Sequence, residues 1–133
     1  MNEMKLSSAV ADFYFSLPSQ KRDKLFELRS LIFEVAKDLP EIGSITECIK
    51  WGQPSYLAEK KTLGTPIRLG LFGDSELAIF VHCQTTLIAQ FRKLYPNWKF
   101  SGNRAIIIPL KGKLAKTKFK NCFSAALLYH QKK

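Results

Sequence analysis

Hydrophobic positions in the first forty residues recur at spacings of three and four, which is typical of amphipathic helices. The pattern predicts a short helix over Ala9 to Phe15, and Pro18 ends it. A longer helix is predicted from Ser19, with apolar side chains on one face and charged side chains on the other as far as Pro40. We therefore expect two helices at the N-terminal end of the chain.

The pattern then changes to short runs rich in β-branched and aromatic residues, which are separated by glycine and proline. A turn signal, Gly73-Asp74-Ser75, predicts an antiparallel hairpin between two of these runs. A mostly antiparallel sheet of about five strands is therefore expected. The predicted strands lie near Cys48 to Trp51, Tyr56 to Ala58, Ile67 to Phe72, Leu77 to Val81 and Ala105 to Leu110.

Helical spacing returns twice in the second half of the chain. The first such segment, Gln84 to Tyr95, is inserted between two predicted strands, and Pro96 ends it. The second, Leu114 to His130, is the C-terminal helix. A chain of 133 residues suits one hydrophobic core. We predict that residues 1–133 fold as one α+β domain.

Composition narrows the class of protein. With 46% hydrophobic and 24% charged residues, the chain is typical of globular proteins. The three cysteines form no CxxC pair, which favours reduced thiols in the cytoplasm over a disulfide framework or a zinc site. No window approaches the ~20 apolar residues that cross a bilayer, so we expect no membrane association.

Charge is distributed unevenly along the chain. Residues 1–76 contain all 11 acidic residues and 10 of the 21 basic ones, whereas residues 77–133 contain 11 basic residues and no acidic one. The net charge of +10 therefore comes from the C-terminal half. This asymmetry predicts an anionic partner.

Several segments resemble the YdhG-like family of small bacterial domains of unknown function. The run Glu47 to Tyr56 contains Ile-Lys-Trp-Gly-Gln-Pro-Ser-Tyr, which is similar to the family's IKWGxPxY segment. Further similarity lies in His82 to Leu87, Phe91-Arg92, Tyr95-Pro96 and Gly102 to Ala105. The resemblance implies a curved, mostly antiparallel sheet with helices packed against it.

The resemblance also implies a possible iron-chaperone role, because some relatives are described as frataxin-like iron chaperones. Such a role relies on surface carboxylates, since iron as a hard cation prefers oxygen ligands. This chain departs from that pattern, because no Asp or Glu follows Glu76. We therefore give iron binding less weight than the functions considered next.

The segment from Lys50 to Tyr56 has two interpretations. In the first, Trp51 or Tyr56 stacks on a planar ligand while Lys50 meets the ligand's negative charge. In the second, Gly52 and Pro54 kink the strand and the aromatic rings fill the core beneath it. Periodicity alone leaves both open.

A second candidate region follows His82, where a predicted strand gives way to a helix. The first-turn N–H groups of that helix, with the hydroxyls of Thr85 and Thr86, are able to hold an anion. Arg92 and Arg104 are candidates for a phosphate or carboxylate clamp. The alternative is that this segment only caps the helix and Arg92 is a solvated surface residue.

The pair His82-Cys83 invites a metal or nucleophile interpretation, which the geometry disfavours. Neighbouring residues of a strand point to opposite sides, so the imidazole cannot act on the adjacent thiol. The remaining candidate ligands, Cys48, Cys122 and His130, have no metal-ligand spacing. No catalytic motif is recognised, so we name no catalytic residue, no metal site and no cofactor.

A lysine cluster in the C-terminal half supports a different function, non-specific nucleic-acid binding. Trp98, Phe100 and Phe119 are interleaved with it and offer possible stacking surfaces. A solvated, solubilising face is the other interpretation. The favoured function remains a pocket for a small anionic molecule beside the Lys-Trp-Gly-Gln-Pro segment. The lysine cluster consists of Lys99, Lys111, Lys113, Lys116, Lys118 and Lys120.

Overall fold

The computed structural model describes residues 6–60 and 62–131, and within them it contains four α-helices, one short 3-10 helix and six strands. The elements are α1 (Ser8–Phe15), α2 (Ser19–Lys37), η1 (Pro40–Ile42), β1 (Ile45–Lys50), β2 (Gln53–Ala58), β3 (Ile67–Phe72), β4 (Glu76–Phe80), α3 (Leu87–Leu94), β5 (Lys99–Ser101), β6 (Ala105–Pro109) and α4 (Lys116–Leu127). The predicted α+β class is confirmed. The sheet has one strand more than expected, because β5 has only three residues and is too short to show an alternating pattern.

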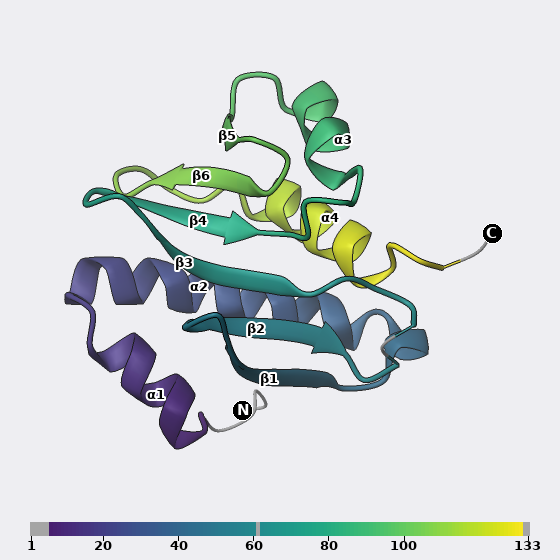
Figure 1. Ribbon diagram of the computed structural model, residues 1–133, viewed down its shortest axis with the longest axis horizontal. Coiled ribbons are helices and arrows are strands. Elements are labelled where there is room, and N and C mark those ends of the chain that lie inside the picture. The colour runs from purple at the N-terminus through teal and green to yellow at the C-terminus, as the bar shows by residue number, and fades with distance from the viewer. Residues whose placement is uncertain (1–5, 61, 132–133) are drawn as a thin grey trace.

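The six strands form one antiparallel sheet in the order β1-β2-β3-β4-β6-β5. The predicted hairpin between β3 and β4 is confirmed, with Phe72 paired to Glu76 across the turn. Strands that are neighbours in the sheet are also consecutive in the chain, with one exception. Between β4 and β6 the chain forms α3 and β5 (Figure 1). Local connections therefore build most of the sheet.

Helices α2 and α4 cover one face of the sheet, which holds the main core (Figure 1). Alternate strand residues such as Leu69, Ile79 and Ile106 point to this side and pack with Ile32 of α2 and Phe123 of α4. Burial of these apolar side chains is the main force that holds the helices to the sheet. None of the helices described is long and apolar enough to cross a membrane.

The opposite face of the sheet, called the open face below, carries a separate and smaller apolar cluster. Ala78, Ala105 and Ile107 are buried there beneath the half-buried rings of Phe72 and Phe80. Figure 1 shows no helix in front of this face. The residues that alternate with the core positions are therefore available to form a surface.

A polar network is buried between the sheet and the N-terminal helices. Arg29 of α2 and Glu47 of β1 form a bidentate ion pair with contacts of 2.5 and 3.0 Å, and their side chains are only 7% and 2% exposed. The hydroxyls of Tyr14 in α1 and Tyr56 in β2 lie 2.6 Å apart. Burial raises the pKa of both phenols, so both stay neutral in the folded protein.

The end of α4 is joined to the loop between β2 and β3 by backbone hydrogen bonds. The Thr65 N–H donates to the Ala126 carbonyl at 2.9 Å, and the His130 N–H donates to the Leu63 carbonyl at 2.7 Å. These bonds fix the loop that leads into β3 at Ile67.

Candidate functional site

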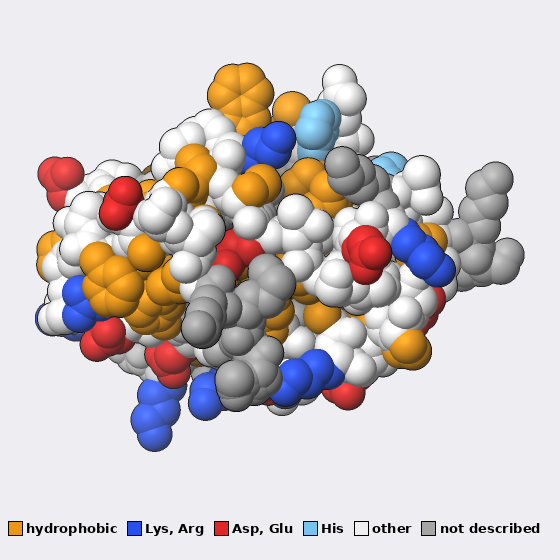
Figure 2. All heavy atoms as spheres, turned by 90° about the horizontal axis from the view of Figure 1, so that it is seen from below, with side chains coloured by type: hydrophobic (Ala, Val, Ile, Leu, Met, Phe, Trp, Pro, Cys, Tyr) orange, Lys and Arg blue, Asp and Glu red, His pale blue; other side chains and the backbone are white. Residues whose placement is uncertain are grey.

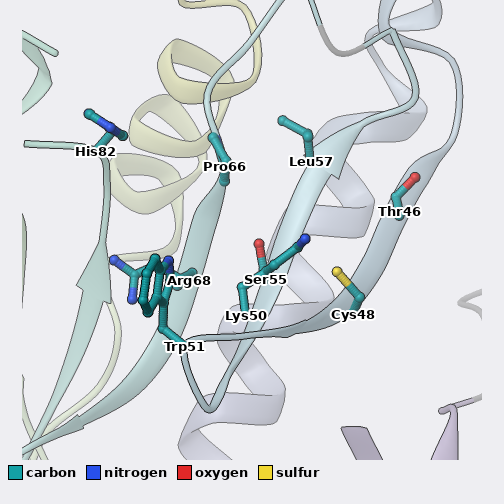
Figure 3. Close-up of a pocket in the computed structure, with 9 residues that line it drawn as sticks. All are labelled: Thr46, Cys48, Lys50, Trp51, Ser55, Leu57, Pro66, Arg68 and His82. Atoms are coloured by element: carbon teal, nitrogen blue, oxygen red, sulfur yellow. The ribbon is translucent and has the colours of Figure 1, made fainter. Parts of the chain in front are cut away.

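A pocket with a volume of about 310 Å³ lies on the open face at the end of the sheet formed by β1, β2 and β3 (Figure 3). Its walls come from the outward positions of these strands, from the β1–β2 turn and from the segments that flank β3 and follow β4. The lining residues are Thr46, Cys48, Lys50, Trp51, Ser55, Leu57, Pro66, Arg68 and His82. None of these nine described residues carries a carboxylate.

The β1–β2 turn places Trp51 at the mouth of this pocket. Lys50 pairs with Gln53, so Trp51 and Gly52 form a two-residue loop, and both have positive φ angles of 55° and 74°. These angles are those of a type I′ turn, which favours Asn-Gly because a side chain in the left-handed region is strained. Gly52 suits its position, whereas tryptophan at the first position is unusual.

Trp51 combines this strained backbone with a side chain that is 89% exposed. A strained bulky residue normally persists because packing holds it in place, but Trp51 has little packing. The strained backbone of Trp51 costs about 1–3 kcal/mol, and packing of its side chain in the core does not offset this. Packing within the fold therefore does not account for a tryptophan at this position.

Arg68 extends from β3 into the same pocket and is held by two neighbouring strands (Figure 3). Its Nη1 donates a hydrogen bond of 2.6 Å to Oε1 of Gln53, and its guanidinium lies 5.4 Å from the ring centroid of Phe80. Gly70 makes room for both supports: a Cβ there would lie 2.6 Å from the Gln53 Nε2 atom and 3.3 Å from the Phe80 ring. The two contacts that orient the guanidinium thus come from an uncharged amide and an aromatic ring.

The charge of Arg68 is uncompensated in the described structure. Within residues 6–60 and 62–131, neither Arg68 nor Arg104 nor Lys50 forms an ion pair. Partial burial lowers the pKa of Arg68, and the nearby charge of Arg104 lowers it further. A negative charge beside the guanidinium would favour its charged form and so oppose both effects. The surroundings of Arg68 therefore favour a negative charge.

Charged side chains are distributed unevenly over the surface. Figure 2 looks at the molecule from below, so that the open face of Figure 1 forms its upper edge. Acidic and basic side chains are interspersed over most of this view, but along the upper edge basic and histidine side chains adjoin hydrophobic ones, with no acidic side chain among them. Among the residues that line the pocket, Lys50 and Arg68 are cationic and none is acidic, so the lining carries a positive charge.

His82 contributes a hydrogen-bond donor at the rim of the pocket. Its Nδ1 accepts a hydrogen bond of 3.1 Å from the backbone N–H of Gln84, so the neutral ring carries its proton on Nε2. This leaves Nε2–H as the ring donor. Lys50, Trp51 and His82 are thus the predicted residues that the structure brings together in one pocket.

Tyr56 does not line the pocket. It lies on β2 with its side chain in the main core, fully buried and hydrogen-bonded to Tyr14. The core-filling interpretation of the Lys50 to Tyr56 segment therefore holds for Tyr56, whereas Trp51 is exposed on the turn and does not fill the core.

Thr85, Thr86 and Arg92 also lie outside the pocket. The Thr86 N–H donates to the Tyr129 hydroxyl at 2.9 Å, so this N–H at the start of α3 already has a partner. That bond, and one from the Thr86 side chain, lower the pKa of Tyr129. Arg92 donates to the Gly102 carbonyl at 2.8 Å and lies over the ring of Phe100, so it ties α3 to the β5–β6 turn. The predicted clamp does not form around the start of α3.

The lysine cluster is partly engaged in contacts within the protein. Lys99 pairs with Glu76 and Lys120 with Glu34, both at 2.9 Å, and Lys118 lies 5.6 Å from the Tyr95 ring centroid. Lys111, Lys113 and Lys116 are exposed. Lys111 and Lys113 line a second hollow of about 330 Å³ beside β6.

The aromatic residues near this cluster also have partners inside the fold. The Trp98 ring is stacked between Tyr95 and Phe119, with centroid distances of 4.3 and 4.6 Å. Two of the predicted stacking surfaces for bases, Trp98 and Phe119, are therefore already used by each other.

Sequence reasoning missed Arg68, the charged residue that extends into the pocket, and Gln53, which supports it from β2. A signal exists in β3, where Arg68 and Gly70 alternate with the apolar positions Ile67 and Leu69 and must point away from the core. An arginine next to a glycine in the middle of a strand is an unusual outward pair.

Comparison with known proteins supports the fold and leaves the site to be argued from its geometry. No protein-family model matches the sequence, and no curated protein matches it. Among solved structures, the chain is similar to the crystal structure of YdhG, a DUF1801-family protein from Bacillus subtilis. The match covers 88% of this chain and 86% of YdhG, with a TM-score of 0.63 and 16% identity. The chain has a YdhG-like fold.

Within this YdhG-like fold, the metal ligands that an iron chaperone needs do not converge. In the described ranges, no three His, Cys, Asp or Glu side chains lie close enough to hold a metal ion. The three cysteines lie in different environments. Cys83 is exposed, Cys48 lines the pocket, and Cys122 is buried, which raises the pKa of its thiol to about 12.

Proposed function

We propose that the protein binds a small anionic molecule in the pocket on the open face. The observation that carries the proposal is Arg68, a half-buried guanidinium without a carboxylate partner among the described residues, aimed into a pocket that also contains Lys50 and His82. Arginine held in a fixed orientation suits carboxylate and phosphate oxygens, because its planar fork donates two parallel hydrogen bonds.

The size of the pocket also supports a small molecule. Its volume of about 310 Å³ lies at the lower end of the range typical of ligand sites, roughly 300–1,000 Å³. Polar hydroxyls from Thr46 and Ser55 and apolar walls from Leu57 and Pro66 complete it. Few polar groups on a mostly apolar wall are the usual composition of a site that orients one ligand.

Nucleic-acid binding through the lysine cluster has less support. Two of the six lysines form ion pairs with acidic residues, and Trp98 and Phe119 are stacked within the protein. Lys111, Lys113 and Lys116 are exposed and fit equally well with a solvated surface.

Titration with inorganic phosphate, followed by nuclear magnetic resonance of the backbone and side-chain N–H groups, tests the proposal. Phosphate should shift the Arg68 Nε–H, the Trp51 indole N–H and the Ser55 amide, with chloride at the same ionic strength as the reference. Arg68→Gln should reduce the affinity by roughly 10-fold or more, since a hydrogen bond to a charged group contributes about 1.5–3 kcal/mol.

Lys93→Gln is the matched control, because Lys93 is an exposed cation of α3 that lines none of the pockets described here. It removes the same charge and should leave the phosphate affinity unchanged. Equal losses in both variants, or shifts confined to the lysine cluster, would show that phosphate responds only to the net charge and would refute the proposal.

A further inference from the structure

Trp51 carries an inference about the chemistry of the ligand, which rests on the proposed anion site. Lys50, Arg68 and His82 account for negative charge, but none of them explains an exposed indole in a strained turn. An aspartate or asparagine would form the same turn at lower cost. The turn itself therefore does not explain the tryptophan, and we look for the reason in a contact between its ring and the ligand.

The indole lines the same pocket as the guanidinium of Arg68, and both come from the end of the sheet at which β1 turns into β2 (Figure 3). A flat face with delocalised electrons binds other flat rings by stacking, which is a contact that aliphatic molecules do not reproduce. The cations beside it bind acidic oxygens. One ligand meets both demands when its acidic group is attached to a planar ring.

The remaining walls agree with a planar ligand of modest size. Leu57 and Pro66 provide apolar contacts, and Thr46 and Ser55 are small side chains that occupy little of the pocket. A volume of about 310 Å³ has room for one or two fused rings with an acidic substituent.

We propose that the pocket selects aromatic anions, with the ring stacked on Trp51 and a carboxylate or phosphate on Arg68. Selectivity then divides between two residues. Trp51 distinguishes an aromatic ring from an aliphatic one, and Arg68 distinguishes an anion from a neutral molecule. Lys50 and His82 add charge and a hydrogen-bond donor at the rim.

Matched pairs of acids test this division. Benzoate and cyclohexanecarboxylate have the same charge and similar size, and phenyl phosphate and cyclohexyl phosphate repeat the comparison for the other acidic group. We expect each aromatic acid to bind roughly 5- to 100-fold more tightly than its aliphatic partner, as stacking on one aromatic side chain provides. Whichever pair binds more tightly overall identifies the acidic group.

Two variants separate the contributions. Trp51→Asn keeps a residue suited to the type I′ turn and should reduce benzoate affinity to that of cyclohexanecarboxylate. Arg68→Gln should weaken both acids by a similar factor and preserve the ratio between them. The chemical shift of the Trp51 indole N–H gives the affinity in the wild type. Trp51 fluorescence in a Trp98→Phe background gives an independent value.

The outcomes distinguish this inference from the proposed function. If aromatic and aliphatic acids bind alike, or if Trp51→Asn leaves their ratio unchanged, the aromatic selectivity is wrong while the anion site stands. If none of the four acids binds but phosphate still shifts Arg68, the selectivity is again wrong and the anion site again stands. If neither phosphate nor any of the four acids binds, both the aromatic selectivity and the anion site are wrong.

Discussion

Arg29 and Arg68 contribute to opposite faces of the same sheet and differ in how their charge is treated. Arg29 is buried on the helix-covered face, where Glu47 neutralises it through two hydrogen bonds. Arg68 is half-buried on the open face, where its contacts among the described residues are the neutral Gln53 and the Phe80 ring. A neutralised charge stabilises the protein itself, whereas an oriented charge without a counterion is suited to bind a ligand.

The two faces share the strands that carry this contrast. Glu47 pairs with Tyr56 and Cys48 pairs with Ser55, so consecutive residues of β1 and β2 alternate between the core and the pocket. The register of this one hairpin therefore positions both sets. A slip by one residue would exchange them, placing a thiol in the buried ion pair and a carboxylate in the pocket.

The largest expected effect comes from removing the carboxylate on the covered face. Glu47→Gln removes the carboxylate that neutralises the buried Arg29 guanidinium and should lower the free energy of unfolding by about 3–5 kcal/mol, measured by urea denaturation. Glu76→Gln removes the carboxylate of the exposed pair with Lys99 and should cost about 1 kcal/mol or less. Similar losses in the two variants would mean that the ion pair on the covered face contributes no more to stability than the exposed pair.

The tyrosine pair should give the next largest effect. Tyr56→Phe leaves the Tyr14 hydroxyl buried without its partner and should cost about 1–3 kcal/mol. The double variant Tyr14→Phe/Tyr56→Phe removes both hydroxyls and should cost less than the sum of the two single changes. An additive result would indicate that the hydroxyls do not depend on each other.

The same pair predicts how stability depends on alkaline pH. Burial raises the pKa of both phenols in the folded protein, whereas in the unfolded chain they ionise near pH 10. The folded state therefore holds more protons above pH 10, so their contribution to stability is complete below that pH and falls above it, by up to about 1.4 kcal/mol per pH unit for each tyrosine. Urea denaturation between pH 9 and 11 should show this slope in the wild type and a shallower slope in the double variant.

The smallest expected effect has the opposite sign and lies on the open face. Trp51→Asn should raise the free energy of unfolding by about 1 kcal/mol, because asparagine adopts the left-handed conformation with less strain. Trp51→Ala keeps that strain while removing the ring, so it should give no gain. A loss of stability in Trp51→Asn, seen as a lower Tm, would mean that the indole supports the fold after all.

The fold was largely predictable because its signals are local. Helical spacing marked the four α-helices, and Gly73-Asp74-Ser75 marked the β3–β4 turn. The missing strand, β5, shows why three residues are too few for a periodic pattern. Trp51 and Tyr56 look alike in sequence, but Trp51 lies in the two-residue turn and is exposed, whereas Tyr56 lies on the strand after it and is buried.

The site was less predictable because its contacts join distant residues. Arg68 depends on Gln53 and Phe80, which lie on two other strands, and no local pattern states that they meet. The anion site expected at the start of α3 failed for a similar reason. The Tyr129 hydroxyl reaches Thr86 from 43 residues away. Ligand binding by Lys50, Trp51 and His82 stays a prediction for the titrations above, and so does ligand binding by Arg104, which does not line the pocket.

The backbone bonds between α4 and the β2–β3 loop give the C-terminal end of the chain a part in shaping the pocket. Thr65, which is bonded to Ala126, immediately precedes Pro66, a wall of the pocket. Among the described residues, none after His82 lines that pocket, yet the position of one wall is set from the far side of the sheet. A shift of the last helix would thus move Pro66 and change the width of the pocket without touching a ligand-binding residue.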